Sequence, residues 1–102
     1  MNKRYEQFEL ENLRSCVLRT LEETPSGTMN ESLLDSIAHG AYGFDSNRKR
    51  MVRVLRWLEE KGLVTLESFN ENCLVAEITA AGARVAQGVE VFPGVKRPER
   101  KA

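Results

Sequence analysis

The sequence predicts a mainly α-helical domain with a small β-hairpin, and three observations lead to this fold class. Apolar residues recur at steps of three and four along the segments expected to be helical. Two shorter runs alternate between apolar and polar residues, and glycine or proline separates most of the segments. With 102 residues, 41% of them hydrophobic and 29% charged, the chain has the size and composition of one soluble domain around a single core.

The first helix is expected from about Tyr5 to Glu23. Its core-facing positions share one side of the helix: Leu10, Leu13, Val17 and Leu21. A second, partly apolar stripe runs beside them: Tyr5, Phe8, Asn12 and Cys16. A small domain seldom buries two stripes of one helix, so Tyr5 and Phe8 are expected at a homodimer interface together with Phe92. The alternative, that Phe8 only covers the edge of its own core, stays open.

The second helix is expected to begin near Thr28 or Asn30, after the break made by Pro25 and Gly27. Thr28 and Glu31 have the spacing of a capping box, in which a hydroxyl and a carboxylate satisfy the first free amides reciprocally. The buried side of this helix is formed by Leu33, Leu34, Ile37 and Ala38. The glycine turn HGAYGF ends it.

The third helix is expected to open at Asp45 or Ser46, because both residues are good N-caps. Its inward positions lie within one arc: Met51, Val54, Leu55 and Leu58. Gly62 suits the left-handed position after the helix, and Leu63 can then contact Leu58, as in a Schellman motif.

Two strands and a short helix complete the predicted fold. LVTLESF and CLVAEIT alternate in polarity, and turn formers join them as a hairpin: Asn70, Glu71 and Asn72. Thr79 is expected to cap the helix AAGARVAQG. The domain is expected to span residues 1–92, and PGVKRPERKA (93–102) is typical of a flexible basic tail.

The stretch DSNRKRMVRVLRWLEEKGLV concentrates positive charge in a chain whose net charge is zero. The chain has 15 basic and 15 acidic residues, yet five cations fall within nine positions of this stretch without an acid between them: Arg48, Lys49, Arg50, Arg53 and Arg56. At 100° per residue, Lys49, Arg53 and Arg56 point away from the buried arc. The sequence therefore predicts a cationic ridge along the third helix.

The order of three helices, hairpin and helix, with the stretch ESLLDSIAHGAYGFDSNRKRMVRVLRWLEEKGLVTLE, resembles winged helix-turn-helix domains of bacterial ArsR-type and MarR-type regulators. The resemblance covers roughly residues 10–88. It implies that residues 46–61 form a recognition helix that docks in the major groove of double-stranded DNA, and that the chain regulates transcription. The ending ITAAGARVAQGVEVFPGVKRP also resembles small winged-helix proteins of Mu-like prophages. The paired cysteines of ArsR-type metal sensors are absent from this helix, so no metal or other cofactor is implied.

Roles on DNA follow from reach along the helix. Residues in the first turns of the helix are expected to contact base edges: Ser46, Asn47, Lys49, Arg50 and Arg53. Arg56 is expected to meet phosphate. Asn70 and Asn72 of the hairpin turn are expected to bond phosphate, and tail cations are expected to follow the DNA backbone: Lys96, Arg97, Arg100 and Lys101. Trp57, at the edge of the ridge, is expected to pack under the hairpin rather than to stack on a base.

A protein-interaction module or assembly adaptor without DNA binding is the alternative function. The first helix is acidic, and the hairpin turn contains Glu71 and no cation. Exposed arginines can also pair locally, as Arg56 can with Glu59 or Glu60. An acidic partner protein would then meet the basic helix.

Enzymatic function is not expected, because no nucleophile, phosphate-binding or dinucleotide-binding motif is present. Cys16 and Cys73 lie far apart and His39 is the only histidine, so the cysteines are expected to be reduced core residues and not zinc ligands. The N-terminal stretch lacks the apolar segment of a secretory signal, and a cytoplasmic location is expected.

Overall fold

The computed structural model describes residues 3–70 and 73–98. Within them it contains four helices and three strands: α1 (Lys3–Glu23), β1 (Thr28–Asn30), α2 (Glu31–Gly40), α3 (Arg48–Glu60), β2 (Val64–Phe69), β3 (Cys73–Ile78) and α4 (Ala80–Ala86). The strands form one antiparallel sheet in the order β1-β3-β2. In the part of the chain that the structure describes, no helix is long and apolar enough to span a bilayer.

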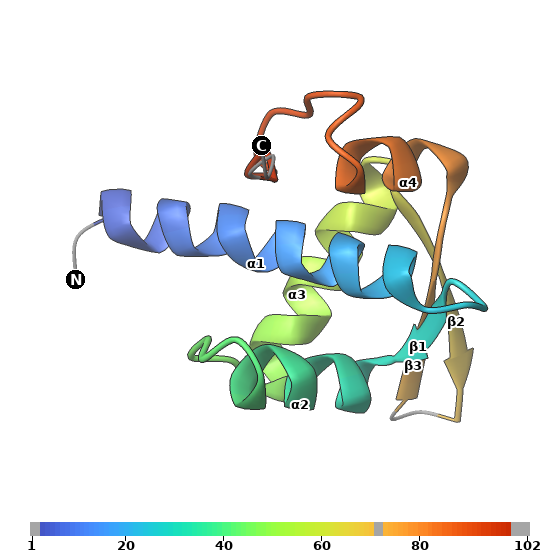
Figure 1. Cartoon of the computed structure of the whole chain (residues 1–102). Coiled ribbons are helices and arrows are strands. Elements are labelled where there is room, and N and C mark those ends of the chain that lie inside the picture. Colours follow the sequence, from blue (N-terminus) through green and yellow to red (C-terminus); the bar gives the residue numbers. More distant parts are fainter. Residues whose placement is uncertain (1–2, 71–72, 99–102) are drawn as a thin grey trace.

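Helix α1 runs across the whole molecule and contacts α2, α3 and α4 (Figure 1). The core begins about halfway along it, and the predicted inward face is confirmed at Leu13, Val17 and Leu21, which are buried. Leu10 is only partly buried against this core. The N-terminal half of α1 therefore projects beyond the other elements (Figure 1), with Tyr5 57% and Phe8 56% exposed.

The segment before α2 differs from the prediction. Thr28 belongs to β1, where it lies opposite Glu77 of β3, and Met29 lies opposite Ala76. The expected capping box is therefore wrong, because Thr28 lies two residues before the N-cap and its hydroxyl donates to the Ser26 carbonyl. Asn30 caps α2 instead, and its side-chain oxygen accepts a hydrogen bond of 2.8 Å from the Leu33 amide.

Helix α3 begins later and ends as expected. Asn47, not Asp45 or Ser46, is its N-cap, and the Asn47 side chain accepts a 2.9 Å hydrogen bond from the Arg50 amide. At the other end the amide of Leu63 donates to the carbonyl of Leu58. Gly62 has a φ of +76°, so the predicted Schellman motif is confirmed.

The hairpin and its following helix are confirmed. Strands β2 and β3 pair from Val64 opposite Ile78 to Phe69 opposite Cys73. Thr79 caps α4, and its hydroxyl accepts a hydrogen bond of 3.0 Å from the Gly82 amide.

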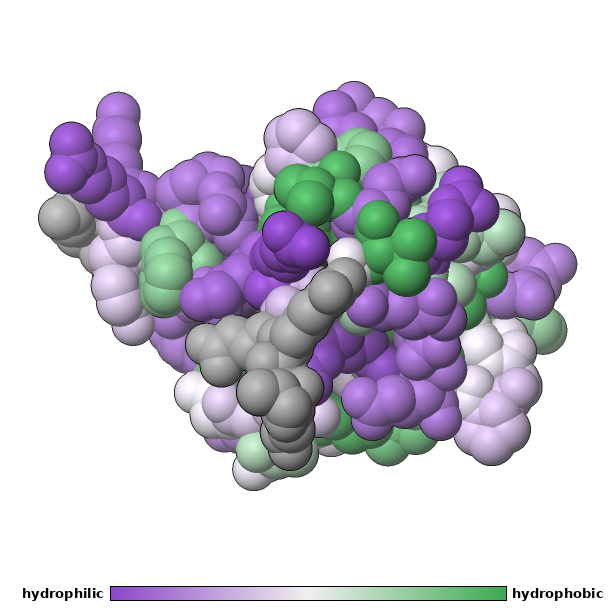
Figure 2. Space-filling model, turned by 45° about the horizontal axis from the view of Figure 1, so that its top comes forward, coloured by the Kyte–Doolittle hydropathy of each residue, from purple (hydrophilic) through white to green (hydrophobic). Residues whose placement is uncertain are grey.

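The segment after α4 folds back over α1, contrary to the expectation that the chain leaves the domain at Pro93. Val95 is buried, and the amide of Lys96 donates to the carbonyl of Glu11 at 3.1 Å. Figure 2 shows small apolar patches among hydrophilic side chains on the face formed by α4 and this segment. The exposed valines of the segment are Val89 and Val91. Packing thus continues past the expected boundary between residues 92 and 93.

Candidate nucleic-acid interface

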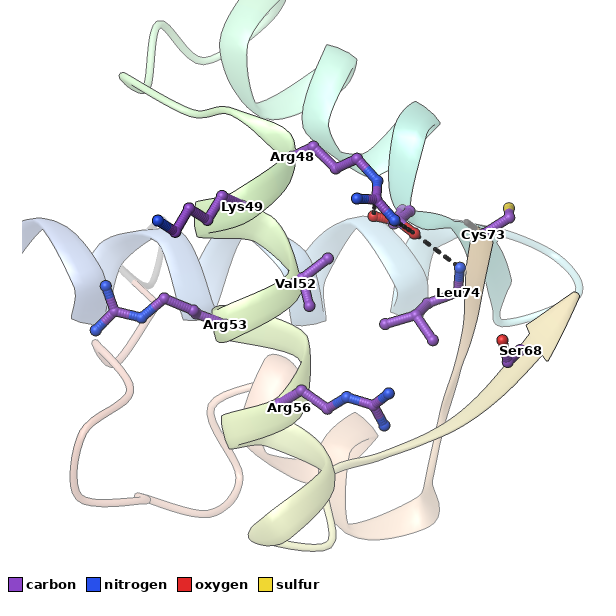
Figure 3. A pocket seen from close by; sticks show the side chains of 9 residues that line it. Arg48, Lys49, Val52, Arg53, Arg56, Ser68, Cys73 and Leu74 are labelled. Atoms are coloured by element: carbon purple, nitrogen blue, oxygen red, sulfur yellow. Dashed lines mark hydrogen bonds and ion pairs between the residues drawn. The ribbon is translucent and has the colours of Figure 1, made fainter. Parts of the chain in front are cut away.

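The side chains of α3 divide into two rows that flank the helix. Arg48, Val52 and Arg56 follow each other at steps of four and face the hairpin (Figure 3). Lys49 and Arg53 form the second row and point to the opposite side of the helix (Figure 3). The predicted cations on the outer side of α3 are present, but they project in two directions and do not form a single edge.

A groove of about 630 Å³ separates the first row from the hairpin. Its lining combines cations of α3 with residues of the sheet: Glu31, Arg48, Lys49, Val52, Arg53, Arg56, Ser68, Cys73 and Leu74. Val52 and Leu74 supply apolar side chains in the middle of the view, and Arg48 and Arg56 stand at either end of the row (Figure 3). The groove thus combines two arginines with an apolar surface between them.

The Glu31 carboxylate lies at the end of this groove that is formed by Arg48 and Leu74. Glu31 is 2% exposed, and its Oε1 accepts a hydrogen bond of 2.8 Å from the Leu74 amide. Its Oε2 lies 3.3 Å from Nε of Arg48. Since β1 ends opposite Val75, the carboxylate replaces the next residue of a neighbouring strand and satisfies the edge of β3. One residue thus joins α2, α3 and the sheet.

Arg50 is held by contacts within its own chain. Its Nη2 lies 2.7 Å from the Glu9 carboxylate of α1, and its Nη1 donates to the Asp45 carbonyl at 3.0 Å. Both side chains of the ion pair are mostly buried. The expected contact of Arg50 with a base edge is therefore replaced by a contact that orients α3 on α1.

Lys49, Arg53 and Arg56 are exposed. Arg56 makes an ion pair of 3.2 Å with Glu59, which is the local pairing expected as an alternative. Neither Lys49 nor Arg53 pairs with an acid among residues 3–70 and 73–98. These two side chains, one turn apart, are the cations that α3 offers most freely to an anionic partner.

The remaining predicted contacts are dispersed. Ser46 donates to the Asp35 carboxylate, and Asn47 is engaged as the N-cap of α3. Asn70 is exposed at the hairpin turn, where its φ is +63°. Asn72, Arg100 and Lys101 lie outside the described residues.

Lys96 and Arg97 belong to the segment that packs on α1. The Lys96 ammonium lies 5.1 Å from the centre of the Phe8 ring, and Arg97 is exposed. Tyr5 and Phe8 share a shallow hollow with Tyr42 and Phe44, the residues of the turn after α2. Phe92 does not join them, because it packs against Trp57 within its own chain.

Trp57 is packed, but against the C-terminal segment and α1 and not under the hairpin. The Phe92 ring meets it edge-on, with 6.1 Å between ring centres. The Arg14 guanidinium lies 3.9 Å above the Trp57 ring and donates to the Gly94 carbonyl at 2.9 Å. This arrangement explains why the chain does not detach at Pro93.

Two residues important to the interface were not expected from the sequence. Arg14 follows Leu10 by four positions and precedes Val17 by three, so the helical wheel already places a cation on the apolar face. Glu31 gives no comparable signal, since its partner Leu74 lies 43 residues further along the chain.

In its described residues the chain forms four helices and a three-stranded sheet, and one of these helices, α3, is strongly cationic. The chain is 35% identical over 92 residues to "Uncharacterized protein gp26" of Escherichia phage Mu, an alignment that covers 90% of this chain and 93% of that protein. It is also 35% identical over 75 residues to an "Uncharacterized protein" of Haemophilus influenzae strain Rd, covering 74% of this chain and 72% of that protein. The chain therefore belongs to the family of phage Mu gp26. No family model and no solved structure matches it.

Proposed function

We propose that this protein is a winged-helix DNA-binding protein that regulates transcription, with α3 docked in the major groove of double-stranded DNA. The observation that carries the proposal is the exposed pair Lys49 and Arg53, free of acids in the described part of the chain, on a helix that stands beside a cationic groove. A duplex presents phosphates on both sides of a helix in its major groove, and α3 carries cations on two sides.

The roles of the residues follow from what holds them. Lys49 meets base edges. Arg53, one turn further along, meets a phosphate of the DNA backbone, whose oxygens match its guanidinium fork. Arg56 leaves Glu59 to meet a phosphate, an exchange that costs little because exposed ion pairs contribute at most about 1 kcal/mol. Asn47 and Arg50 fix the start and the tilt of α3 and stay with their protein partners.

Binding to a random-sequence duplex, followed by fluorescence anisotropy from low to high salt, tests the proposal. Affinity should fall steeply with salt, and Lys49→Ala/Arg53→Ala should reduce the slope of log K against log salt by about 0.9 for each phosphate contact that is lost. Arg19→Ala/Arg84→Ala is the matched control, because it removes the same charge from exposed positions on other helices. Absence of binding by the unaltered protein at low salt would reject DNA as the partner.

The exposed aromatic residues on the projecting half of α1 favour a second role for that surface, contact with another protein chain. We propose a second copy as this partner, so that Tyr5 and Phe8 join two chains in a homodimer with two DNA-reading helices. Sedimentation of Phe8→Glu should show a monomer, whereas Phe69→Glu, at an equally exposed phenylalanine of the hairpin, should sediment like the unaltered chain. If the unaltered protein is a monomer, this surface is left to a different protein, as in an assembly adaptor.

A further inference from the structure

Arg14 is a buried cation without an ion-pair partner among the residues that the structure describes. It is 9% exposed, and its Nε is buried without a hydrogen-bond acceptor in the part of the chain that the structure describes. No carboxylate of the described residues lies within ion-pair distance of its guanidinium. Desolvation by burial lowers the pKa of Arg14, and the charge of nearby Glu11 only partly offsets this effect.

Such an arrangement is costly without a counter-ion. A buried charge loses its hydration, and the loss is repaid only by a partner of opposite sign and by complete hydrogen bonding. Arg14 has stacking on Trp57 and one hydrogen bond to the Gly94 carbonyl, which leaves part of its fork unused. An unsatisfied buried donor in a native protein calls for a specific cause, such as an ion that binds there.

A cleft at the crossing of α1 and α3 reaches this residue. Arg14, Arg53, Arg56, Trp57 and Glu60 are among its lining residues, and its volume is about 350 Å³. The Arg56 guanidinium points to the hairpin and pairs with Glu59, which leaves Arg14 and Arg53 as the cations of the cleft (Figure 3). Two cations therefore stand against one carboxylate, Glu60, which is exposed to solvent, where its charge is screened. The balance of charge in the cleft favours an anion.

We propose that this cleft is a phosphate-binding site in which Arg14 and Arg53 hold the phosphate oxygens. A guanidinium presents its donors in a planar fork that matches phosphate, and stacking on Trp57 keeps the plane of the Arg14 fork fixed. A phosphate in the cleft supplies the missing counter-charge. This inference rests on the proposed function in one respect, the source of the phosphate, which is the backbone of the DNA that α3 reads.

Titration with inorganic phosphate tests the site without DNA. Phosphate should raise the melting temperature and change the emission of Trp57, the only tryptophan of the chain, beyond the effect of chloride at the same ionic strength. Arg14→Lys keeps the charge and loses the fork, and it should weaken phosphate binding by about tenfold. Arg19→Lys, at an exposed arginine of the same helix, should bind phosphate like the unaltered protein.

A second variant guards against a folding defect in Arg14→Lys. Arg53→Gln alters only an exposed side chain of α3, and it should lower phosphate affinity while the circular dichroism spectrum and melting temperature in chloride stay unchanged. Equal effects of phosphate and chloride on the unaltered protein would overturn the proposal, as would unchanged phosphate affinity in both variants.

A short duplex DNA in the same assay separates the site from the proposed function. If phosphate binds and DNA does not, the cleft serves a free phosphate-bearing ligand, and DNA reading by α3 is rejected while the site stands. If DNA binds with equal affinity to Arg14→Lys and to the unaltered protein, and phosphate has no effect, the site is rejected while DNA binding stands.

Discussion

The guanidinium of Arg50 and the carboxylate of Glu9 lie 2.7 Å apart and join the first turn of α3 to the projecting half of α1. The cation that the sequence offers as a reader of bases is thereby used to set the orientation of the helix that carries it. Glu9 is otherwise one acid among several on an acidic helix. The pair explains how α1, although partly outside the core, stays in a fixed position relative to α3.

Replacing Glu9 by glutamine should have opposite effects on stability and on DNA affinity. Loss of this mostly buried ion pair should lower the free energy of unfolding by roughly 1 kcal/mol. Arg50 becomes free, so affinity for duplex DNA at low salt should rise. Urea denaturation and anisotropy measure the two effects, and Glu6→Gln, at an exposed acid one turn earlier, controls for the change in net charge. Equal DNA affinity of the two variants would show that Arg50 does not reach DNA even when released.

Replacing Glu31 by leucine should destabilise the protein by roughly 1–3 kcal/mol, since the Leu74 amide loses its acceptor inside the protein. Glu31→Gln keeps a side-chain oxygen for that amide and should cost less. Chemical denaturation of both variants measures the difference, and slowed hydrogen exchange of the Leu74 amide should persist only in Glu31→Gln. Equal losses in the two variants would mean that the ion pair with Arg48, and not the backbone contact, carries the stability.

Replacing Gly82 by alanine should destabilise the protein although alanine is the better helix former. The higher helix propensity of alanine alone would stabilise the protein by about 1 kcal/mol. However, a Cβ at this position would lie 2.1 Å from the Leu63 carbonyl oxygen, so α4 must move away from the start of β2. A net loss of roughly 1–3 kcal/mol is expected. Gly40→Ala, at the end of α2, meets no atom within 4 Å and should be neutral or stabilising, as thermal denaturation of both variants will show.

The two cysteines should differ strongly in reactivity. Burial raises the pKa of the Cys16 thiol, against smaller opposing effects of the Thr20 hydroxyl and the Arg19 charge. Cys73 is partly exposed at the groove beside α3. At pH 8, Ellman's reagent should therefore modify one thiol per chain quickly, and Cys73→Ser should abolish this fast reaction. A fast reaction that survives in Cys73→Ser would contradict the burial of Cys16.

The same shift has a consequence for stability at alkaline pH. Because the folded pKa of Cys16 is raised, the folded state favours the neutral thiol. The contribution of the neutral Cys16 thiol to the free energy of unfolding is complete below the ordinary thiol pKa. It is lost as pH rises through the pKa of Cys16 in the folded state. The stability of the unaltered protein should therefore fall more steeply above the ordinary thiol pKa than that of Cys16→Ala, as urea denaturation at a series of pH values will measure.

Local signals explain which parts of the fold the sequence predicts. The end of α3 depends on Gly62, Leu63 and Leu58, which are neighbours in the chain, and the prediction is confirmed. The strand β1 is only three residues long and exists because β3, more than forty residues later, pairs with it. No periodicity can reveal so short an element, and the capping box predicted there was wrong for that reason.

The candidate interface divides in the same way. Helical geometry predicts that Lys49 and Arg53 share an exposed face, since this depends only on their spacing. It cannot predict that Glu9 holds Arg50 or that Glu31 meets Arg48, because those acids come from other elements. Whether a surface cation is paired or open to a partner depends on which carboxylates the tertiary fold brings near it.

The return of residues 92–96 onto α1 and Trp57 brings a late part of the chain against the earliest helix. During synthesis on the ribosome, the outer side of α1 is covered only after this segment has emerged from the exit tunnel. Chains truncated shortly after α4 should therefore leave Trp57 and the α1–α3 crossing open to proteases.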